Sequence, residues 1–311
     1  MGKLRILYIQ ILIFILLSQF SLKALENKIL FKIDNEIITS VDVFHEIKYL
    51  QIMNKEILNL EKDKIYEIAK NSLIRDKIKE IEVLKKFKKI NLENKFFNQT
   101  LINYHSKLGL RSINEIDEFL SRNNLDIEKI KYRIAILNYW NNLIYSLYSS
   151  KIRIDQDEIK ENIVKNSKNT TKNYLLSEIV FNIEDKETIN NKINYIYESI
   201  KNEGFENTAL IYSIAESARN SGLIGWINEN SLTKKIKKEI FKLKINEYTD
   251  PIKIPSGYII LKVNDIKENK IKIDIEKELK KVINEKTNEQ LNNYSNIYFN
   301  KIKKSTQIEN I

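Results

Sequence analysis

The chain has no cysteine, and it has few histidines and prolines. Without a thiol, its 311 residues can form neither a disulfide nor a thiolate nucleophile. The two histidines, His45 and His105, stand apart in the sequence, so they predict no metal site. Both of the 2 prolines lie after Thr249, so no proline interrupts the helices expected before that residue.

Clusters of basic residues that would bind nucleic acid are also lacking. The net charge is +10, but 45 lysines accompany only 7 arginines, and the lysines are interleaved with Glu and Asp. Proteins that bind DNA or RNA more often gather basic residues on one face and use arginine for base edges. We interpret the charge as solvated helix surfaces, with a functional basic surface as the alternative, and expect no nucleic-acid partner. With 42% hydrophobic and 30% charged residues, the composition is that of a globular protein.

Residues 1–24 have the layout of a secretory signal peptide. Lys3 and Arg5 form a basic front, residues 6–17 form an apolar run, and Ala24 is a small residue at the expected cleavage point. The run is short for a membrane span, so we expect export to the periplasm, where a chain without cysteine has no thiol to oxidise. Leu22 is larger than the residue preferred at its distance from the cut, which leaves an uncleaved membrane anchor as the alternative.

Residues 25–168 predict a mostly helical module. A turn at Asp34-Asn indicates a short hairpin, after which Thr39 or Ser40 caps the first helix. Asp126 caps one of the later helices, whose apolar residues recur with helical spacing.

Residues 169–267 form a more β-rich segment with three ordered motifs. Tyr174-Leu-Leu-Ser-Glu-Ile-Val-Phe comes first, Ser213-Ile-Ala-Glu-Ser-Ala-Arg-Asn-Ser-Gly-Leu-Ile-Gly-Trp follows, and Ser256-Gly-Tyr-Ile-Ile-Leu-Lys-Val closes the segment. This order resembles a parvulin-type (PpiC-type) peptidyl-prolyl isomerase domain. The strands and helices expected from these motifs follow the order β-α-α-α-β-β, which gives a small antiparallel sheet wrapped by helices.

The resemblance keeps the scaffold of that family but not its chemical groups. Where parvulins carry two histidines and a cysteine or aspartate, this chain has Glu178, Ile259 and Ala215. Parvulins hold a twisted prolyl amide in a hydrogen-bonded network, and these degenerate positions cannot rebuild it, so no catalytic residue is assigned. The resemblance also implies an apolar substrate-binding cup and one remaining hydroxyl near it, at Ile224, Leu232, Ile236 and Ser256.

Other residues of this segment receive structural interpretations. We expect Ser213 to cap a helix, Ser231 to cap the helix that follows it, and Trp226 to pack in the core beneath the cup. Glu178 has two readings: a partly solvated residue on a strand edge, or a groove carboxylate whose raised pKa lets it stand in as an acid.

A second resemblance covers the helical module. Asn35-Glu-Ile-Ile-Thr with Asp42, and Phe119-Leu with Leu125-Asp, resemble the N-terminal module of SurA-like periplasmic chaperones. In that family a C-terminal helix packs back on this module. The segment 268–311 carries an apolar stripe suited to such docking, at Ile275, Leu279, Val282, Ile283, Leu291 and Tyr298.

Together the patterns predict a predominantly helical α+β protein with one degenerate parvulin-like domain. Its expected function is that of a periplasmic chaperone that binds unfolded outer-membrane β-barrel proteins and needs neither ATP nor a cofactor. The alternatives are an active peptidyl-prolyl cis-trans isomerase and, if residues 1–24 are retained, a membrane-anchored folding factor.

Overall fold

The computed structural model describes residues 27–92, 95–166, 171–183, 188–269 and 274–311. The predicted signal peptide, residues 1–24, lies outside these ranges. The described chain is mostly helical and contains two antiparallel sheets, in the strand orders β2-β1-β7 and β4-β3-β6-β5. The expected α+β class is therefore confirmed. Within the described ranges, no helix is both long and apolar enough to cross a membrane.

The N-terminal hairpin forms as its sequence predicts. Strands β1 (Ile29–Ile33) and β2 (Glu36–Thr39) pair across a turn in which Asp34 adopts a positive φ of 50°. Thr39, and not Ser40, caps the next helix: its hydroxyl accepts the N–H of Asp42, whose carboxylate accepts the N–H of Thr39 at 2.9 Å.

Five further helices complete the first part of the chain. The first four pack around two apolar clusters, one of which contains the fully buried Trp140, and the last packs in a third cluster. The helices of this part are α2 (Ser40–Met53), α3 (Lys62–Lys86), α4 (Lys95–His105), α5 (Ile113–Arg122), α6 (Ile127–Tyr148) and α7 (Gln156–Asn166). Asp126 caps α6 through the N–H of Glu128, as expected.

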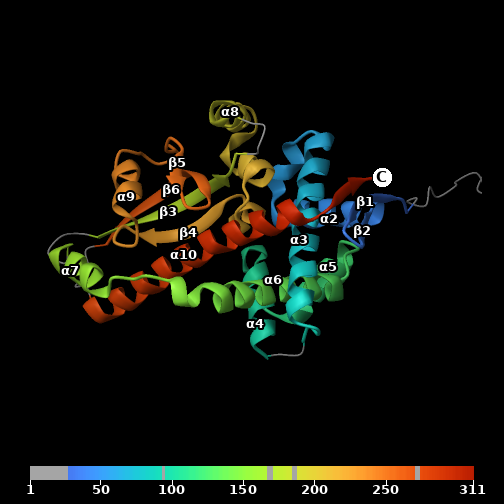
Figure 1. Ribbon diagram of the computed structural model, residues 1–311, viewed down its shortest axis with the longest axis horizontal. Coiled ribbons are helices and arrows are strands. Elements are labelled where there is room, and N and C mark those ends of the chain that lie inside the picture. Colours follow the sequence, from blue (N-terminus) through green and yellow to red (C-terminus); the bar gives the residue numbers. More distant parts are fainter. Residues whose placement is uncertain (1–26, 93–94, 167–170, 184–187, 270–273) are drawn as a thin grey trace, which may run out of the picture.

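The C-terminal helix α10 (Ile275–Ser305) packs back on this helical module (Figure 1). Its first half buries Val282 against α7, and its second half places Phe299 beside Trp140, with ring centroids 6.4 Å apart. This docking was expected from the apolar stripe. The strand that follows was not: β7 (Ile308–Asn310) pairs with β1, so the two ends of the described chain share one sheet.

The segment between α7 and α10 folds around the second sheet, and we call it the sheet domain. Its helices cover the four strands, and α10 runs along one side of it (Figure 1). Its elements are β3 (Thr171–Phe181), α8 (Ile189–Tyr212), the short helix η4 (Glu216–Asn220), β4 (Leu223–Asn228), α9 (Lys234–Ile240), β5 (Ile252–Ile254) and β6 (Gly257–Asn269).

Two details of the sheet domain differ from the sequence interpretation. The expected order lacked β4, which begins at Leu223 and pairs with β3. Ser231 does not cap the next helix: Thr233 does, because its hydroxyl accepts the N–H of Ile236 at 3.3 Å. The two helices expected on either side of Gly204 are both present within α8, which is broken at Gly204 by its non-helical backbone with a φ of 83°.

Candidate functional site

A cavity of about 530 Å³ lies between the sheet domain and α10. This volume falls within the range of about 300–1,000 Å³ that is typical of ligand pockets. Residues from β3, β4, α9, β5 and β6 form an apolar wall on one side. The opposite wall is polar and comes from α10. The cavity therefore presents a ligand with two chemically different surfaces.

The structure brings most of the predicted site residues to this one cavity. Six of them line it: Glu178, Ala215, Ile224, Leu232, Ile236 and Ile259. Ser256 is the exception. It is buried in the turn between β5 and β6, where its hydroxyl donates to Oδ1 of Asn293 at 3.1 Å. The assignment of a substrate-binding role to these residues stays a prediction.

Glu178 lies at the polar end of the apolar wall. Its carboxylate accepts a hydrogen bond from the hydroxyl of Ser217 at 2.7 Å. Burial raises the pKa of Glu178 to about 7; the Ser217 bond opposes the rise and the charge of Glu289 adds to it. Glu178 was interpreted either as a partly solvated strand-edge residue or as a groove carboxylate. Its position favours the groove carboxylate, whose protonation changes near neutral pH.

A close backbone approach fixes the position of Glu178. The N–H of Glu178 donates to the carbonyl of Gly222 at 2.8 Å. Gly222 has a φ of 77°, and a Cβ placed on it would come within 2.4 Å of the Glu178 carbonyl oxygen. The glycine of the sequence motif is therefore required on both grounds, and it seats the loop after η4 against β3.

Ser213 and Trp226 have different roles in the structure. Ser213 ends α8, and its buried hydroxyl accepts the N–H of Val180 at 3.0 Å, which anchors the end of α8 on β3. Trp226 was expected in the core, and this is wrong. Its side chain is only partly buried and lines the cavity, and the ammonium group of Lys267 lies 4.1 Å from the centroid of its rings.

Helix α3 holds the segment that forms one end of the cavity. The guanidinium of Arg75 donates to the carbonyls of Ser213 and Ala215, at 2.9 and 3.1 Å. Lys79 pairs with Glu216 on the same segment. These contacts join the helical module to the sheet domain, and no local pattern in the sequence predicts them.

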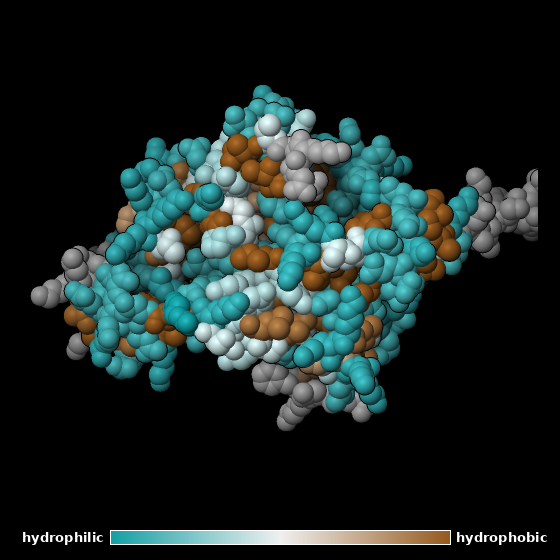
Figure 2. Space-filling view, viewed as in Figure 1, coloured by the Kyte–Doolittle hydropathy of each residue, from teal (hydrophilic) through white to brown (hydrophobic). Residues whose placement is uncertain are grey.

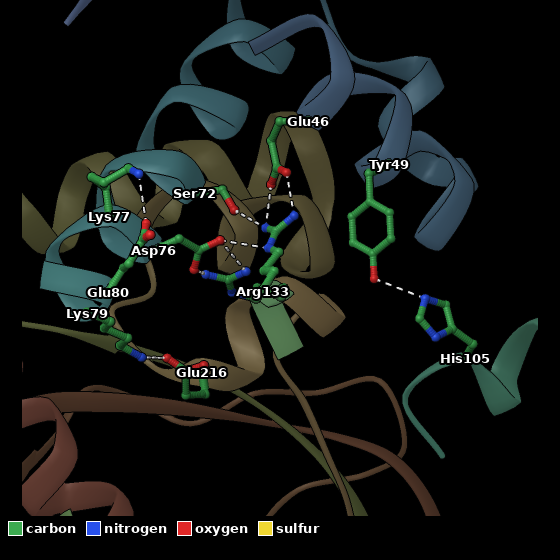
Figure 3. Close-up of polar contacts among 11 residues, drawn as sticks. Glu46, Tyr49, Ser72, Asp76, Lys77, Lys79, Glu80, His105, Arg133 and Glu216 are labelled. Carbon is green, nitrogen blue, oxygen red and sulfur yellow. Dashed lines mark hydrogen bonds and ion pairs between the residues drawn. The ribbon is translucent and has the colours of Figure 1, made fainter. Parts of the chain in front are cut away.

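A buried network of charges extends this interface into the helical module (Figure 3). Arg133 on α6 donates to both carboxylate oxygens of Glu46, at 2.5 and 2.8 Å, and its Nε lies 2.7 Å from Oδ2 of Asp76. Asp76 also binds Arg219 of η4, at 2.9 Å. Burial alone would raise the pKa of Glu46, but the charge of Arg133 outweighs it and holds that pKa below its usual range.

The two histidines lie in the helical module, away from the cavity. His105 is fully buried; one ring nitrogen is 2.9 Å from the carbonyl of Leu101 and the other is 3.3 Å from the hydroxyl of Tyr49 (Figure 3). His45 lines a second, smaller cavity of about 250 Å³ between α2, α3 and α6. Over the ranges that the structure describes, no group of three or more His, Asp or Glu residues could hold a metal ion.

Residues 175–265 match the family described as Rotamase: PPIC-type PPIASE domain. Foldase protein PrsA of Geobacillus sp. (strain WCH70) is 38% identical over 85 residues, which cover 26% of this chain and 31% of that protein. Chaperone SurA of Pseudomonas putida is 21% identical over 185 residues, or 57% of this chain and 43% of that protein. The matched region thus spans less than half the length of either relative.

Solved structures give matches of lower similarity. A SurA-like chaperone of Campylobacter jejuni is 18% identical with a TM-score of 0.35, over 92% of this chain and 99% of that one. A PpiC-type peptidyl-prolyl cis-trans isomerase domain is 22% identical with a TM-score of 0.29, over 32% of this chain and 94% of that one.

Proposed function

We propose that this chain, which carries a PPIC-type rotamase domain over residues 175–265 and is similar to SurA and PrsA chaperones, binds unfolded polypeptides without isomerising them. Its clients on this proposal are unfolded outer-membrane β-barrel proteins, and it works in the periplasm. On this proposal the chain is divided into a signal peptide (1–24), a helical chaperone module (25–168), a parvulin-like domain (169–267) and a docked C-terminal helix (268–311).

One observation carries the proposal: the cavity keeps its apolar cup but contains no imidazole. Ile224, Leu232 and Ile236 line the cup together with Ile259, which stands where the resemblance expects a histidine. Both histidines of the chain lie in the helical module instead. An apolar pocket is sufficient to hold a client side chain, and an extended backbone can pair with polar groups around it.

The second candidate function is an isomerase that uses a different acid. Glu178 favours it, because a carboxyl with a pKa of about 7 is protonated in part of the population at neutral pH. Ser217 would then be its hydrogen-bond partner near the substrate amide. An apolar cup beside a titrating acid suits either function, so the two candidates differ only in whether the rate of prolyl exchange rises.

Suppression of aggregation tests the chaperone proposal. A denatured outer-membrane β-barrel protein is diluted into buffer with the wild type, with Ile224→Asp or with Ile245→Asp. Ile224 lines the cup and is 36% exposed, whereas Ile245 lies outside the cavity and is 48% exposed, so the two variants add the same charge at comparably accessible sites. We expect Ile224→Asp to lose most of the suppression and Ile245→Asp to keep it. Equal suppression by all three proteins would rule out the cup as the client site.

The proposed location rests on residues 1–24 and is tested separately. We expect the protein recovered from the periplasm to begin near Leu25. N-terminal sequencing of the periplasmic fraction measures this directly. Recovery of a chain that still contains Met1, in the membrane fraction, would support the membrane-anchored alternative instead.

A further inference from the structure

The polar wall of the cavity is built from one face of α10. Its residues form two rows with a spacing of four, so they share a face of the helix. The rows are Glu285, Glu289 and Asn293, and Asn288, Asn292 and Asn296. The face of the molecule seen in Figure 2 is mainly hydrophilic, and its apolar side chains gather in separate patches.

Two members of the first row already bind the sheet domain. The hydroxyl of Ser231 donates to the carboxylate of Glu285, and that of Ser256 donates to Asn293. Ser231 precedes α9 and Ser256 lies between β5 and β6, so the two bonds attach α10 to two loops of the domain. They hold the polar wall opposite the apolar one.

The second row has no such partners. Among the residues that the structure describes, no hydrogen bond or ion pair engages the side chains of Asn288, Asn292 and Asn296. Asn296 is only 8% exposed and lines the cavity. An amide there, without a protein partner, is left to form its hydrogen bonds with water or a ligand.

We propose that this asparagine row, Asn288 with Asn292 and Asn296, binds the backbone of an extended client peptide whose apolar side chain fills the cup. The inference rests on the proposed chaperone function and assigns its ligand contacts. A carboxamide has both donors and an acceptor, so each asparagine can pair with an N–H and a C=O of the same peptide. Such pairing is independent of client sequence, and the cup supplies the preference for an apolar residue.

The spacing of the row fits an extended chain. Residues four apart on an α-helix are separated by about 6 Å along its axis. Alternate residues of a β-strand are separated by about 6.6 Å and point to the same side. A peptide that runs parallel to α10 can therefore place every second backbone unit opposite one asparagine. The side chains on its other side then point toward the apolar wall.

The charges around the row define which clients fit. Glu289 belongs to the first row, has no ion-pair partner among the described residues, and burial raises its pKa; Lys286 opposes this rise. Glu178 faces the same cavity from the other wall. Two carboxyl groups without a cationic partner repel an acidic peptide, so the preferred client segment is uncharged or basic with one apolar anchor.

Fluorescence anisotropy of a labelled basic peptide with a central Leu-Pro-Phe measures the effect. The test variant is Asn288→Ala with Asn292→Ala, two exposed positions where alanine favours the helix. The control is Asn284→Ala, an exposed asparagine of α10 that does not line the cavity. We expect the double variant to bind about tenfold more weakly and the control within about twofold of the wild type, since each lost hydrogen bond costs a few-fold in affinity. Asn296→Ala should weaken binding similarly, with an unchanged melting temperature showing that it folds.

A backbone-modified peptide distinguishes the loss of backbone hydrogen bonds to the asparagine row from a general loss of affinity. Replacing alternate peptide N–H groups by ester oxygens removes donors and keeps every side chain. We expect the wild type to bind the ester peptide more weakly than the amide peptide. The double variant should bind the two peptides equally well. If the wild type binds no peptide, the chaperone function itself fails. If it binds peptide but the double variant binds as tightly, or discriminates equally against the ester, the asparagine row is not the binding element and the chaperone function stands.

Discussion

Two sets of polar groups lie beside the sheet domain, one at its interface with α3 and one in the cavity. They differ in whether their members have protein partners. At the interface with α3, Arg133 and Arg219 share Asp76, and Arg133 also binds Glu46. In the cavity, Glu289 and the asparagine row have no side-chain hydrogen bond or ion pair with the protein within the described ranges. Paired buried charges hold two parts of a protein in one arrangement, whereas polar groups without a protein partner are left to bind water or a ligand. This difference supports the proposal that the interface stabilises the protein and that the cavity binds a ligand.

The largest effect on stability is expected from breaking an ion pair at the interface with α3. Arg133→Ala leaves the carboxylate of Glu46, which is 3% exposed, without its partner. Removing one member of a buried pair typically costs about 3–5 kcal/mol in the free energy of unfolding. Urea denaturation measures the loss.

The matched control for this variant is Arg122→Ala. Arg122 pairs with Glu118 on the surface of α5, where the two side chains are 75% and 70% exposed. Such a pair contributes well under about 1 kcal/mol. If both arginine variants lose the same small amount of unfolding free energy, the network around Asp76 does not hold the helical module and the sheet domain together.

An intermediate effect is expected from the pH dependence of stability at Glu178. Its pKa in the folded protein is about 7, against an ordinary value of 4.5. A raised folded pKa stabilises the protein fully below the unfolded pKa, and this contribution is lost as the pH rises through the folded pKa. One pKa unit corresponds to about 1.4 kcal/mol, so the wild type should lose up to about 3 kcal/mol relative to Glu178→Gln between about pH 4 and pH 8. Parallel stability curves for the two proteins would show that Glu178 ionises normally.

The smallest effect is expected at Glu289. Burial raises the pKa of its carboxyl and no protein partner within the described ranges compensates the charge, so removing that charge should not destabilise the fold. We expect Glu289→Gln to raise the melting temperature slightly at neutral pH, with a gain below about 1 kcal/mol. A loss of stability would mean that the carboxylate is paired in solution, and the comparison between interface and cavity would weaken.

Local sequence patterns predicted the elements that depend on near neighbours. Thr39 caps α2 and Asp126 caps α6 because each cap is completed within a few residues. The docking face of α10 followed from its apolar stripe, since an isolated helix would leave residues such as Val282 in water. The motif glycine Gly222 lies where a side chain would collide with β3.

Features that depend on distant partners were missed. The strand β7 exists because β1 offers it an edge, and nothing within Ile308–Asn310 marks a strand. Trp226 was expected in the core beneath the cup, but it is only partly buried and lines the cavity. The asparagine row of α10 shows helical spacing in the sequence, yet its meaning depends on the sheet domain that faces it, which sequence spacing alone does not reveal.

Prolyl exchange measured by NMR tests the central claim most directly. A short Xaa-Pro peptide is followed in its cis and trans forms, with and without the protein, and no protease is needed. The account predicts that resonances of the peptide broaden or shift on binding while the exchange rate between the two forms stays at its uncatalysed value. A strong acceleration of exchange that Glu178→Ala abolishes would contradict it, and the protein would then be an isomerase whose acid is Glu178.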